Sequence, residues 1–108
     1  MNQGLELWQA EWCPSSHRVR QRLTELGLTF TAYQVPARRE ARGDLMNLTG
    51  HDTIPLLCAD GEIVAGSERI LVYLNDHYPE PPGSADHRAR ASEIEQLERK
   101  EAASCAAP

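Results

Sequence analysis

Cys13 is the residue with the clearest chemical potential in the sequence. It lies in the stretch WCPSSH, residues 12–17, between a short apolar run and a segment with helical spacing. Three residues later, where a dithiol redox motif would have its second cysteine, the residue is Ser16. A sulfur at a helix start lies beside unpaired backbone N–H groups and the positive end of the helix dipole, which favour thiolate. The stretch therefore predicts one reactive thiol; the alternative is a small buried hydrophobe.

Charged neighbours of Cys13 are expected to act in opposite directions. His17 and Arg18, in the first turns of the expected helix, would add positive charge, whereas Glu11 opposes them. A helix N-terminus lowers a thiol pKa below its usual value of about 8.5. We therefore expect a lowered pKa for Cys13, limited by Glu11.

The second signal is the segment TIP, residues 53–55, directly before an expected β-hairpin. A proline that opens a strand here invites a cis peptide bond, which would leave the Ile54 N–H and C=O unpaired beside Cys13. Unpaired strand backbone can bind an extended peptide. The alternative is that Pro55 only starts a strand, and the spacing does not decide between the two.

The third signal is the segment AGSE, residues 65–68, at the start of an expected helix. Helix N-termini bind carboxylates, so the Ser67 hydroxyl and the nearby N–H groups would hold one, while Glu68 would accept from an amine. Taken alone, the segment is a plain helix cap. Together with Cys13 and Ile54 it predicts one surface for a small thiol peptide.

The elements that position these residues follow from periodicity and turn signals. Two strands, Leu5–Gln9 and Thr29–Val35, flank a helix that begins at Pro14 and ends at Gly27. A polar helix is expected over Ala37–Leu48, with Leu45 and Leu48 as its core contacts. The remaining expected elements are a hairpin of Ile54–Ala59 and Glu62–Ala65 around Asp60-Gly61, a helix capped by Ser67 with the buried stripe Ile70, Leu71 and Leu74, and a last helix capped by Ser84 that ends near Ala103.

The order β-α-β-α-β-β-α predicts an α/β protein with a thioredoxin-like fold, a central four-stranded mixed sheet and an extra C-terminal helix. Residues 1–79 are expected to form this domain, and residues 80–108 a linker and charged helical tail. In the tail only Ile94 and Leu97 are sizeable apolar residues. The tail is therefore a solvated appendage, a weak docking helix or a partner-binding segment.

Composition narrows the class of protein. The net charge of −5 argues against a nucleic-acid partner, and the cluster of Arg38, Arg39 and Arg42 is expected to be a solvated helix face. Without a membrane span or secretory signal, a cytoplasmic location is expected.

The other cysteines and the histidines give weaker signals. Three cysteines at wide spacings favour free thiols over a structural disulfide, with Cys58 in the core and Cys105 an incidental free thiol or a distant resolving thiol. The histidines show no metal-ligand spacing, so no metal site is expected.

Three segments in this order resemble glutaredoxin motifs: WCPSS (12–16), TGHDTIP (49–55) and GSE (66–68). The run SERILVYL (67–74) equally resembles the N-terminal domain of glutathione S-transferases, and the resemblance covers about Leu5 to Tyr78. Three features depart from these families. Glutaredoxins often have a basic residue before the cysteine, where this chain has Ala10-Glu11, and transferases have an acidic residue where Gly66 stands. The helical second domain of a transferase has no room here.

The resemblance implies a monothiol glutaredoxin-like oxidoreductase that removes glutathione, or another small thiol, from mixed disulfides of protein or small-molecule substrates. The implied catalytic residues are Cys13 and Ser16, and the implied glutathione-binding residues are Trp12, Pro14, Thr53, Ile54, Pro55, Gly66, Ser67 and Glu68. Glutathione would be a co-substrate. The alternatives are a module that binds glutathione or an iron-sulfur cluster without turnover, and a transferase-like domain without its helical half.

Overall fold

The computed structural model describes the backbone of residues 4–106 and the side chains of residues 4–101. Its elements are β1 (Glu6–Gln9), α1 (Pro14–Glu25), β2 (Thr31–Gln34), η1 (Arg39–Ala41), α2 (Gly43–Thr49), β3 (Leu56–Ala59), β4 (Glu62–Ala65), α3 (Ser67–His77) and α4 (Ser84–Ala106). The predicted order of strands and helices is confirmed, with an additional short 3-10 helix, η1.

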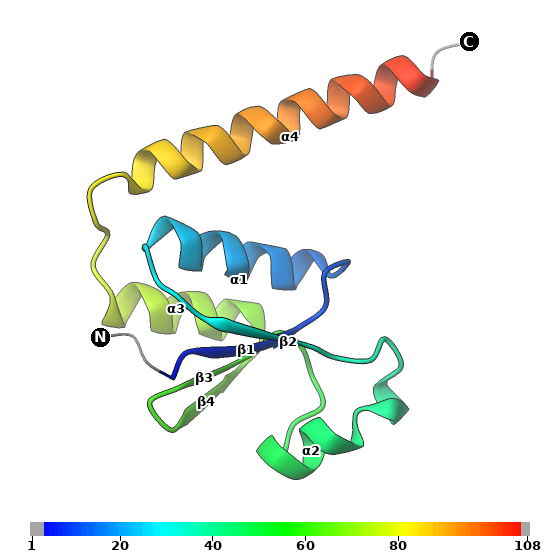
Figure 1. Ribbon diagram of the computed structural model, residues 1–108, viewed down its shortest axis with the longest axis vertical. Helices are drawn as coiled ribbons and strands as arrows, with labels where there is room; N and C mark the ends of the chain where they lie inside the picture. The colour runs from blue at the N-terminus through cyan, green and yellow to red at the C-terminus, as the bar shows by residue number, and fades with distance from the viewer. Residues whose placement is uncertain (1–3, 107–108) are drawn as a thin grey trace.

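The four strands form one mixed sheet in the order β2-β1-β3-β4. Strand β1 runs parallel to β2 and antiparallel to β3, and β3 is antiparallel to β4. Helices α1 and α3 lie on one side of the sheet and α2 lies on the other (Figure 1). This is the thioredoxin-like arrangement that the sequence predicts.

The core lies between the sheet and the layer of α1 and α3. Leu5, directly before β1, and Leu7 within it point the same way and are buried in the core. The helices contribute residues at three- and four-residue spacing, because that spacing returns to the same helix face. The buried helical residues are Val19, Leu23, Leu26, Ile70 and Leu74, as predicted, whereas Leu71 is only half-buried.

The segment between β2 and β3 differs from its prediction. In place of one helix over Ala37–Leu48 there are two short ones, η1 and α2, joined at Arg42. Leu45 is buried as expected, but Leu48 is 67% exposed, so its predicted core contact is wrong.

Arg42 explains the break between η1 and α2. Its guanidinium is buried and donates to the backbone carbonyls of Pro36, Ala37 and Asp52 at 2.8–3.1 Å. These three bonds join the segments on both sides of α2, because Asp52 follows this helix. Arg42 is thus a structural residue, which corrects its predicted place on a solvated helix face.

Helix α4 begins on α1 and then extends beyond the domain (Figure 1). Ser84 does not cap it as predicted, because Gly83 precedes the helix and its carbonyl accepts from the N–H of His87 at 3.0 Å. The buried Ser84 hydroxyl instead donates to the backbone carbonyl of Glu25 at 2.6 Å. Ser84 therefore ties the first turn of α4 to the last turn of α1.

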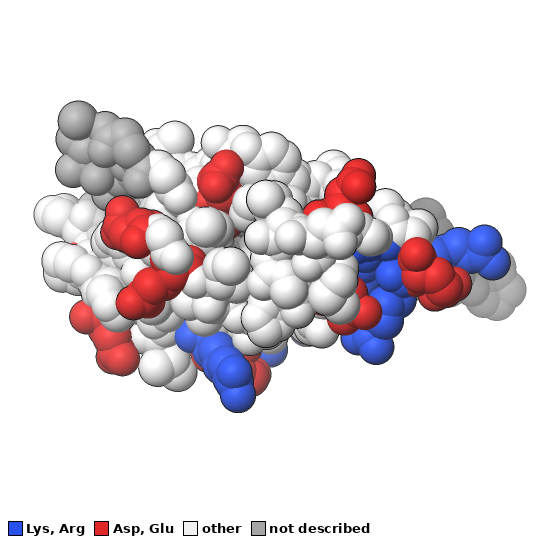
Figure 2. All heavy atoms as spheres, turned by 90° about the horizontal axis from the view of Figure 1, so that it is seen from below, with Lys and Arg blue, Asp and Glu red and all other residues white. Residues whose placement is uncertain are grey.

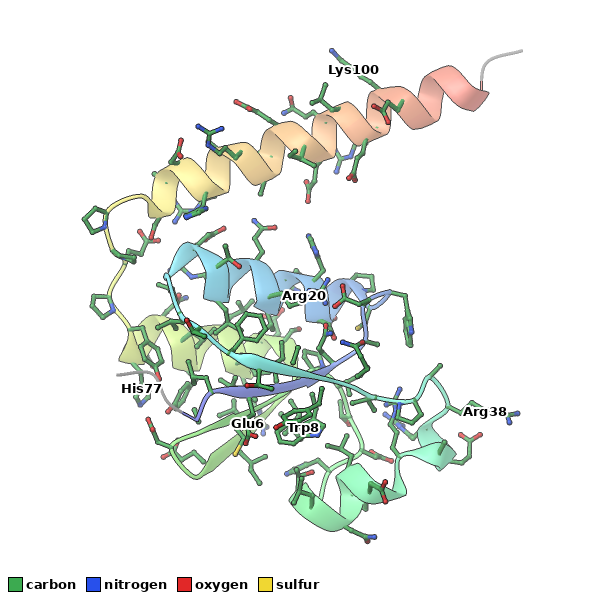
Figure 3. The ribbon with its side chains drawn as sticks, viewed as in Figure 1. Glu6, Trp8, Arg20, Arg38, His77 and Lys100 are labelled. Carbon is green, nitrogen blue, oxygen red and sulfur yellow. The ribbon has the colours of Figure 1, made fainter. Side chains whose placement is uncertain are left out.

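On the face shown in Figure 2, Asp and Glu side chains are scattered among uncharged ones, whereas Lys and Arg side chains lie toward the right and at the lower edge. Glu6 and Trp8 project from the sheet toward this face (Figure 3), and Trp8 stacks on Tyr33 with ring centroids 4.7 Å apart. Within residues 4–106, no helix has both the length and the apolar character needed to cross a membrane.

Candidate functional site

Three strand ends meet at one edge of the sheet, and they bring the three predicted signals together. The pairings Trp8 with Leu56 and Leu56 with Ala65 place the end of β1, the start of β3 and the end of β4 side by side. Cys13 follows β1, the Ile54-Pro55 pair precedes β3, and α3 starts directly after β4. The fold therefore brings segments far apart in the sequence to a common edge.

Cys13 is the N-cap residue of α1, with extended backbone angles (φ −84°, ψ 119°). Its carbonyl accepts from the N–H of His17 at 3.0 Å, and Pro14 begins the helix as expected. Its side chain is half-buried and forms no disulfide. The first turn of α1 contains no acidic residue that would oppose a negative charge there. A thiol in this place lies at the positive end of the helix dipole.

Hydrogen bonds and charge give Cys13 an acidic thiol. Partial burial raises its pKa, but hydrogen bonding by the Ser16 hydroxyl and by the backbone of Ser15 and Ser16 opposes this. The charge of Arg20 acts in the same direction, so that the pKa of Cys13 lies below its ordinary value. Ser16 is fully buried, and its Oγ also accepts from the N–H of Ala10 at 3.3 Å.

Arg20 is the cation that sequence reasoning missed. The expected cations were His17 and Arg18, but the Arg18 guanidinium lies 3.3 Å from the carboxylate of Glu68. Arg20 is seven residues after Cys13, about two helical turns, and so shares its helix face. Long side chains on a helix also point toward its N-terminus, which brings Arg20 nearer to the thiol. Spacing along α1 was thus the available signal.

Ile54 and Pro55 are joined by a cis peptide bond, the first of the two predicted alternatives. The carbonyl of Pro55 accepts from the N–H of Gly66 at 2.9 Å, which links this turn to the start of α3. Among the residues that the structure describes, the N–H and C=O of Ile54 have no hydrogen-bonding partner. The backbone of Ile54 at the common sheet edge can therefore bond to a ligand.

The start of α3 corrects the predicted cap. Gly66, not Ser67, is the N-cap residue, with φ 93° and ψ 141°, a conformation that favours glycine. Ser67 is the first helical residue and is half-buried, while the exposed Glu68 follows it. The pair of Arg18 and Glu68 connects this helix start to α1.

The other predicted residues lie at different depths around this edge. Trp12 is 64% exposed, and Pro14 and Thr53 are also exposed.

Cys58 lies on β3 but is half-buried and absent from the core cluster, so its predicted core position is wrong. The side chain of Cys105 lies outside the described residues. Across the described part of the chain, no group of three or more His, Cys, Asp or Glu could hold a metal ion.

A cleft of about 370 Å³ lies between α1 and α4, adjacent to the residues that follow Cys13. His17 and Arg20 line it from α1, and Ile94, Glu95 and Glu98 line it from α4. Its wall thus combines an exposed aliphatic side chain with groups of both charges.

Comparison with known proteins shows two groups of relatives. Glutathione S-transferase Z2 of Arabidopsis thaliana is 37% identical over 70 residues, which cover 62% of this chain and 31% of that protein. Glutaredoxin 3 of Escherichia coli (strain K12) is 23% identical over 65 residues, covering 60% of this chain and 78% of that one. A diazinon-metabolizing glutathione S-transferase of the silkworm, Bombyx mori, aligns with a TM-score of 0.61 and 29% identity, covering 68% of this chain and 37% of that one.

The chain spans about a third of the length of the transferases that it matches. The family model described as "Glutathione S-transferase, N-terminal domain" matches residues 7–82, which include all three segments at the common sheet edge. The chain therefore belongs to the family of glutathione S-transferase N-terminal domains.

Proposed function

We propose that the protein is a glutathione-dependent thiol-disulfide oxidoreductase that uses Cys13 as its only sulfur nucleophile. The observation that carries the proposal is the half-buried, free Cys13 at the N-cap of α1, with a lowered pKa and with Ser16 where a second cysteine would stand. A thiolate is the nucleophile in disulfide exchange, so a lowered pKa raises the reactive fraction near neutral pH.

The proposed reaction has two exchange steps. In the first, the Cys13 thiolate attacks the glutathione sulfur of a mixed disulfide, R–S–S–G. A disulfide bond forms between Cys13 and the glutathione sulfur, the S–S bond of the mixed disulfide breaks, and the released R–S⁻ takes a proton from water. In the second, the thiolate of another glutathione attacks the glutathione sulfur held on Cys13. Oxidised glutathione leaves, and the Cys13 thiolate is restored.

Glutathione would bind along the common sheet edge. The unpaired N–H and C=O of Ile54 would bond to its cysteinyl part, as an extended peptide bonds to a strand edge. Ser67 and the first N–H groups of α3 would hold the γ-glutamyl carboxylate, and Glu68 would accept from the γ-glutamyl amine. Trp12, Pro14 and Thr53 would border this site. Both transferase and glutaredoxin relatives support glutathione as the thiol.

The remainder of the mixed disulfide would extend away from this edge. The cleft between α1 and α4 is lined by His17 and Arg20, one and two helical turns after Cys13, so we place the R group there. This reaction requires reduced glutathione, and we therefore place the protein in the cytoplasm.

A glutathione-coupled assay on a small mixed disulfide tests the proposal. Wild type should accelerate the reaction, and Cys13→Ser should reduce the rate to that of the uncatalysed exchange. Cys58→Ser is the matched control, because Cys58 is equally half-buried but has a raised pKa, caused first by burial and then by the charge of Glu6. Full activity in Cys13→Ser would contradict the proposal.

Mass spectrometry distinguishes turnover from binding alone. After incubation with oxidised glutathione, wild type should carry one glutathione on Cys13, and reduced glutathione should remove it. If glutathione binds to the wild type but neither the adduct nor turnover is detected, the protein is a binding module and not an oxidoreductase.

A further inference from the structure

Arg20 is held in place by two residues of the segment that leads from β1 to Cys13. Its Nη1 donates to the side-chain oxygen of Gln9, and its Nη2 lies 3.7 Å from a carboxylate oxygen of Glu11. The Gln9 amide also donates to the other carboxylate oxygen of Glu11 at 2.8 Å. Arg20, Gln9 and Glu11 thus form a closed set of contacts, which we call the Arg20 cluster.

The members of the Arg20 cluster differ in their exposure. Gln9 is fully buried at the end of β1, and the Arg20 side chain, on α1 (Figure 3), is 20% exposed. Glu11, in contrast, is 67% exposed. The buried amide fixes the guanidinium without neutralising it, and the exposed carboxylate, partly screened by water, offsets only part of its charge.

We propose that Arg20 is a positioning residue that favours the thiolate form of Cys13. Gln9 holds the Arg20 guanidinium in place, and the negative charge of Glu11 weakens the effect of Arg20 on the thiol. This inference rests on the proposed reactive thiol and assigns the control of its charge. The chain has Ala10-Glu11 where glutaredoxins often have a basic residue shortly before the cysteine, and Arg20 supplies positive charge from α1 instead. An arginine that follows Cys13 in the sequence thus adds to the hydrogen bonds that favour its thiolate form.

The other charged groups around Cys13 do not take this role. His17 lies 3.4 Å from Arg20, ring nitrogen to guanidinium, and is exposed on the same helix. Arg18 is paired with Glu68 of α3 at 3.3 Å, so these two charges offset each other. Hydrogen bonds from Ser16 and Ser15 lower the pKa of Cys13 most, and among the cations Arg20 adds to them through its charge.

The pH dependence of Cys13 alkylation, followed on the Cys13 peptide by mass spectrometry, tests the proposal. Arg20→Gln should raise the alkylation midpoint by about half a pH unit, the effect of one charge about two helical turns away in a partly aqueous setting. Glu11→Gln should lower it, because the side-chain oxygen can still accept from the Gln9 amide while the negative charge beside Arg20 is gone. Arg20→Lys should retain part of the wild-type effect.

Gln9→Met separates positioning from charge alone. Methionine has nearly the volume of glutamine but cannot bond to the guanidinium, so Arg20 would turn to solvent and the midpoint should rise although the charge remains. Arg90→Gln, on the exposed face of α4, removes the same charge and should leave the midpoint unchanged.

Thermal melting of each variant shows whether it is folded. If Arg20→Gln does not fold, the exposed Glu11→Gln gives the decisive measurement. A wild-type midpoint in Arg20→Gln, or in Glu11→Gln when only that variant folds, would overturn the proposal. These alkylation midpoints are measured without substrate. A failure of this proposal is therefore distinguishable from a failure of the proposed oxidoreductase activity.

Discussion

The two ends of helix α1 use similar groups for different purposes. Each end has a buried serine, Ser16 at the start and Ser84 against the last turn. Each also has an arginine beside a glutamate. At the start Arg20 lies near Glu11, and at the end Arg22 lies near Glu25.

At the end of α1 the charges are paired with one another. Glu25 is only 7% exposed, and one carboxylate oxygen lies 2.9 Å from Arg22 and 3.5 Å from Arg88 of α4. Glu80, in the linker, pairs with the same two arginines. We call these four residues the hinge cluster, because they join α1, the linker and α4.

The comparison shows why the hinge cluster only holds elements together, whereas the Arg20 cluster also acts on a reactive group. In the hinge cluster two carboxylates meet two guanidinium groups, so each charge has a partner of opposite sign. In the Arg20 cluster the guanidinium has one exposed carboxylate and a neutral amide, and its remaining field acts on a thiol. The helix dipole reinforces this difference, since thiolate is favoured at the start of a helix and arginine at its end.

The largest expected effect on stability comes from Glu25→Ala. The change removes the buried carboxylate that Arg22 and Arg88 share and leaves them only the more exposed Glu80, so the free energy of unfolding should fall by about 1–3 kcal/mol. Urea unfolding measures this loss. Glu95→Ala, at an exposed site on α4, is the control and should change the value by less than about 0.5 kcal/mol. Equal losses in the two variants would contradict a structural hinge cluster, and the Cys13 alkylation midpoint should be the same in both.

Acidification should weaken the same cluster by a smaller amount, because a protonated Glu25 retains part of its hydrogen bonding. Burial raises the pKa of Glu25, but hydrogen bonds from Gln21 and Arg22 and the charges of Arg88 and Arg22 lower it below its ordinary value. Since the folded-state pKa is the lower one, this stabilisation is complete above the ordinary glutamate pKa of about 4.3 and is lost as the pH falls through the folded-state value.

Glu25→Gln provides the comparison for this pH effect. Glutamine does not titrate, so the free energy of unfolding of the variant should fall less than that of wild type between about pH 5 and pH 3. Parallel pH profiles for the two proteins, measured by urea unfolding, would show that Glu25 titrates alike in the folded and unfolded chain.

The sequence predicts the fold and the position of Cys13 because both depend on local patterns. Alternation in β1, the spacing of Val19 and Leu23, and a proline after Cys13 each act within a few residues. The prediction for the segment around α2 is wrong for the opposite reason, because its structure depends on contacts between distant residues. Arg42 bonds to carbonyls on both sides of α2, and no local periodicity reports such contacts.

The predicted helix caps, Ser67 and Ser84, are wrong for a shared reason. Both Ser67 and Ser84 follow a glycine, and in both places the glycine precedes the helix with φ positive, 93° at Gly66 and 101° at Gly83. Serine is a common cap, so residue type alone favours it. Because the chain enters each helix through a conformation that glycine tolerates, the serines become first helical residues, and the Ser84 hydroxyl bonds to the Glu25 carbonyl instead.

The smallest expected effect, and the finest test of the comparison, is a matched pair of serine substitutions at the two ends of α1. Ser84→Ala removes a buried hydrogen bond to the Glu25 carbonyl, and Ser16→Ala removes one from the Ala10 N–H, so each should reduce the free energy of unfolding by about 1 kcal/mol. Only Ser16→Ala should also raise the Cys13 alkylation midpoint, because the Ser16 hydroxyl lowers the pKa of that thiol. A rise of equal size in Ser84→Ala would mean that the thiol responds to the stability of α1 as a whole. The two ends of the helix would then be coupled, and the lowered pKa of Cys13 would not be a property of its own end.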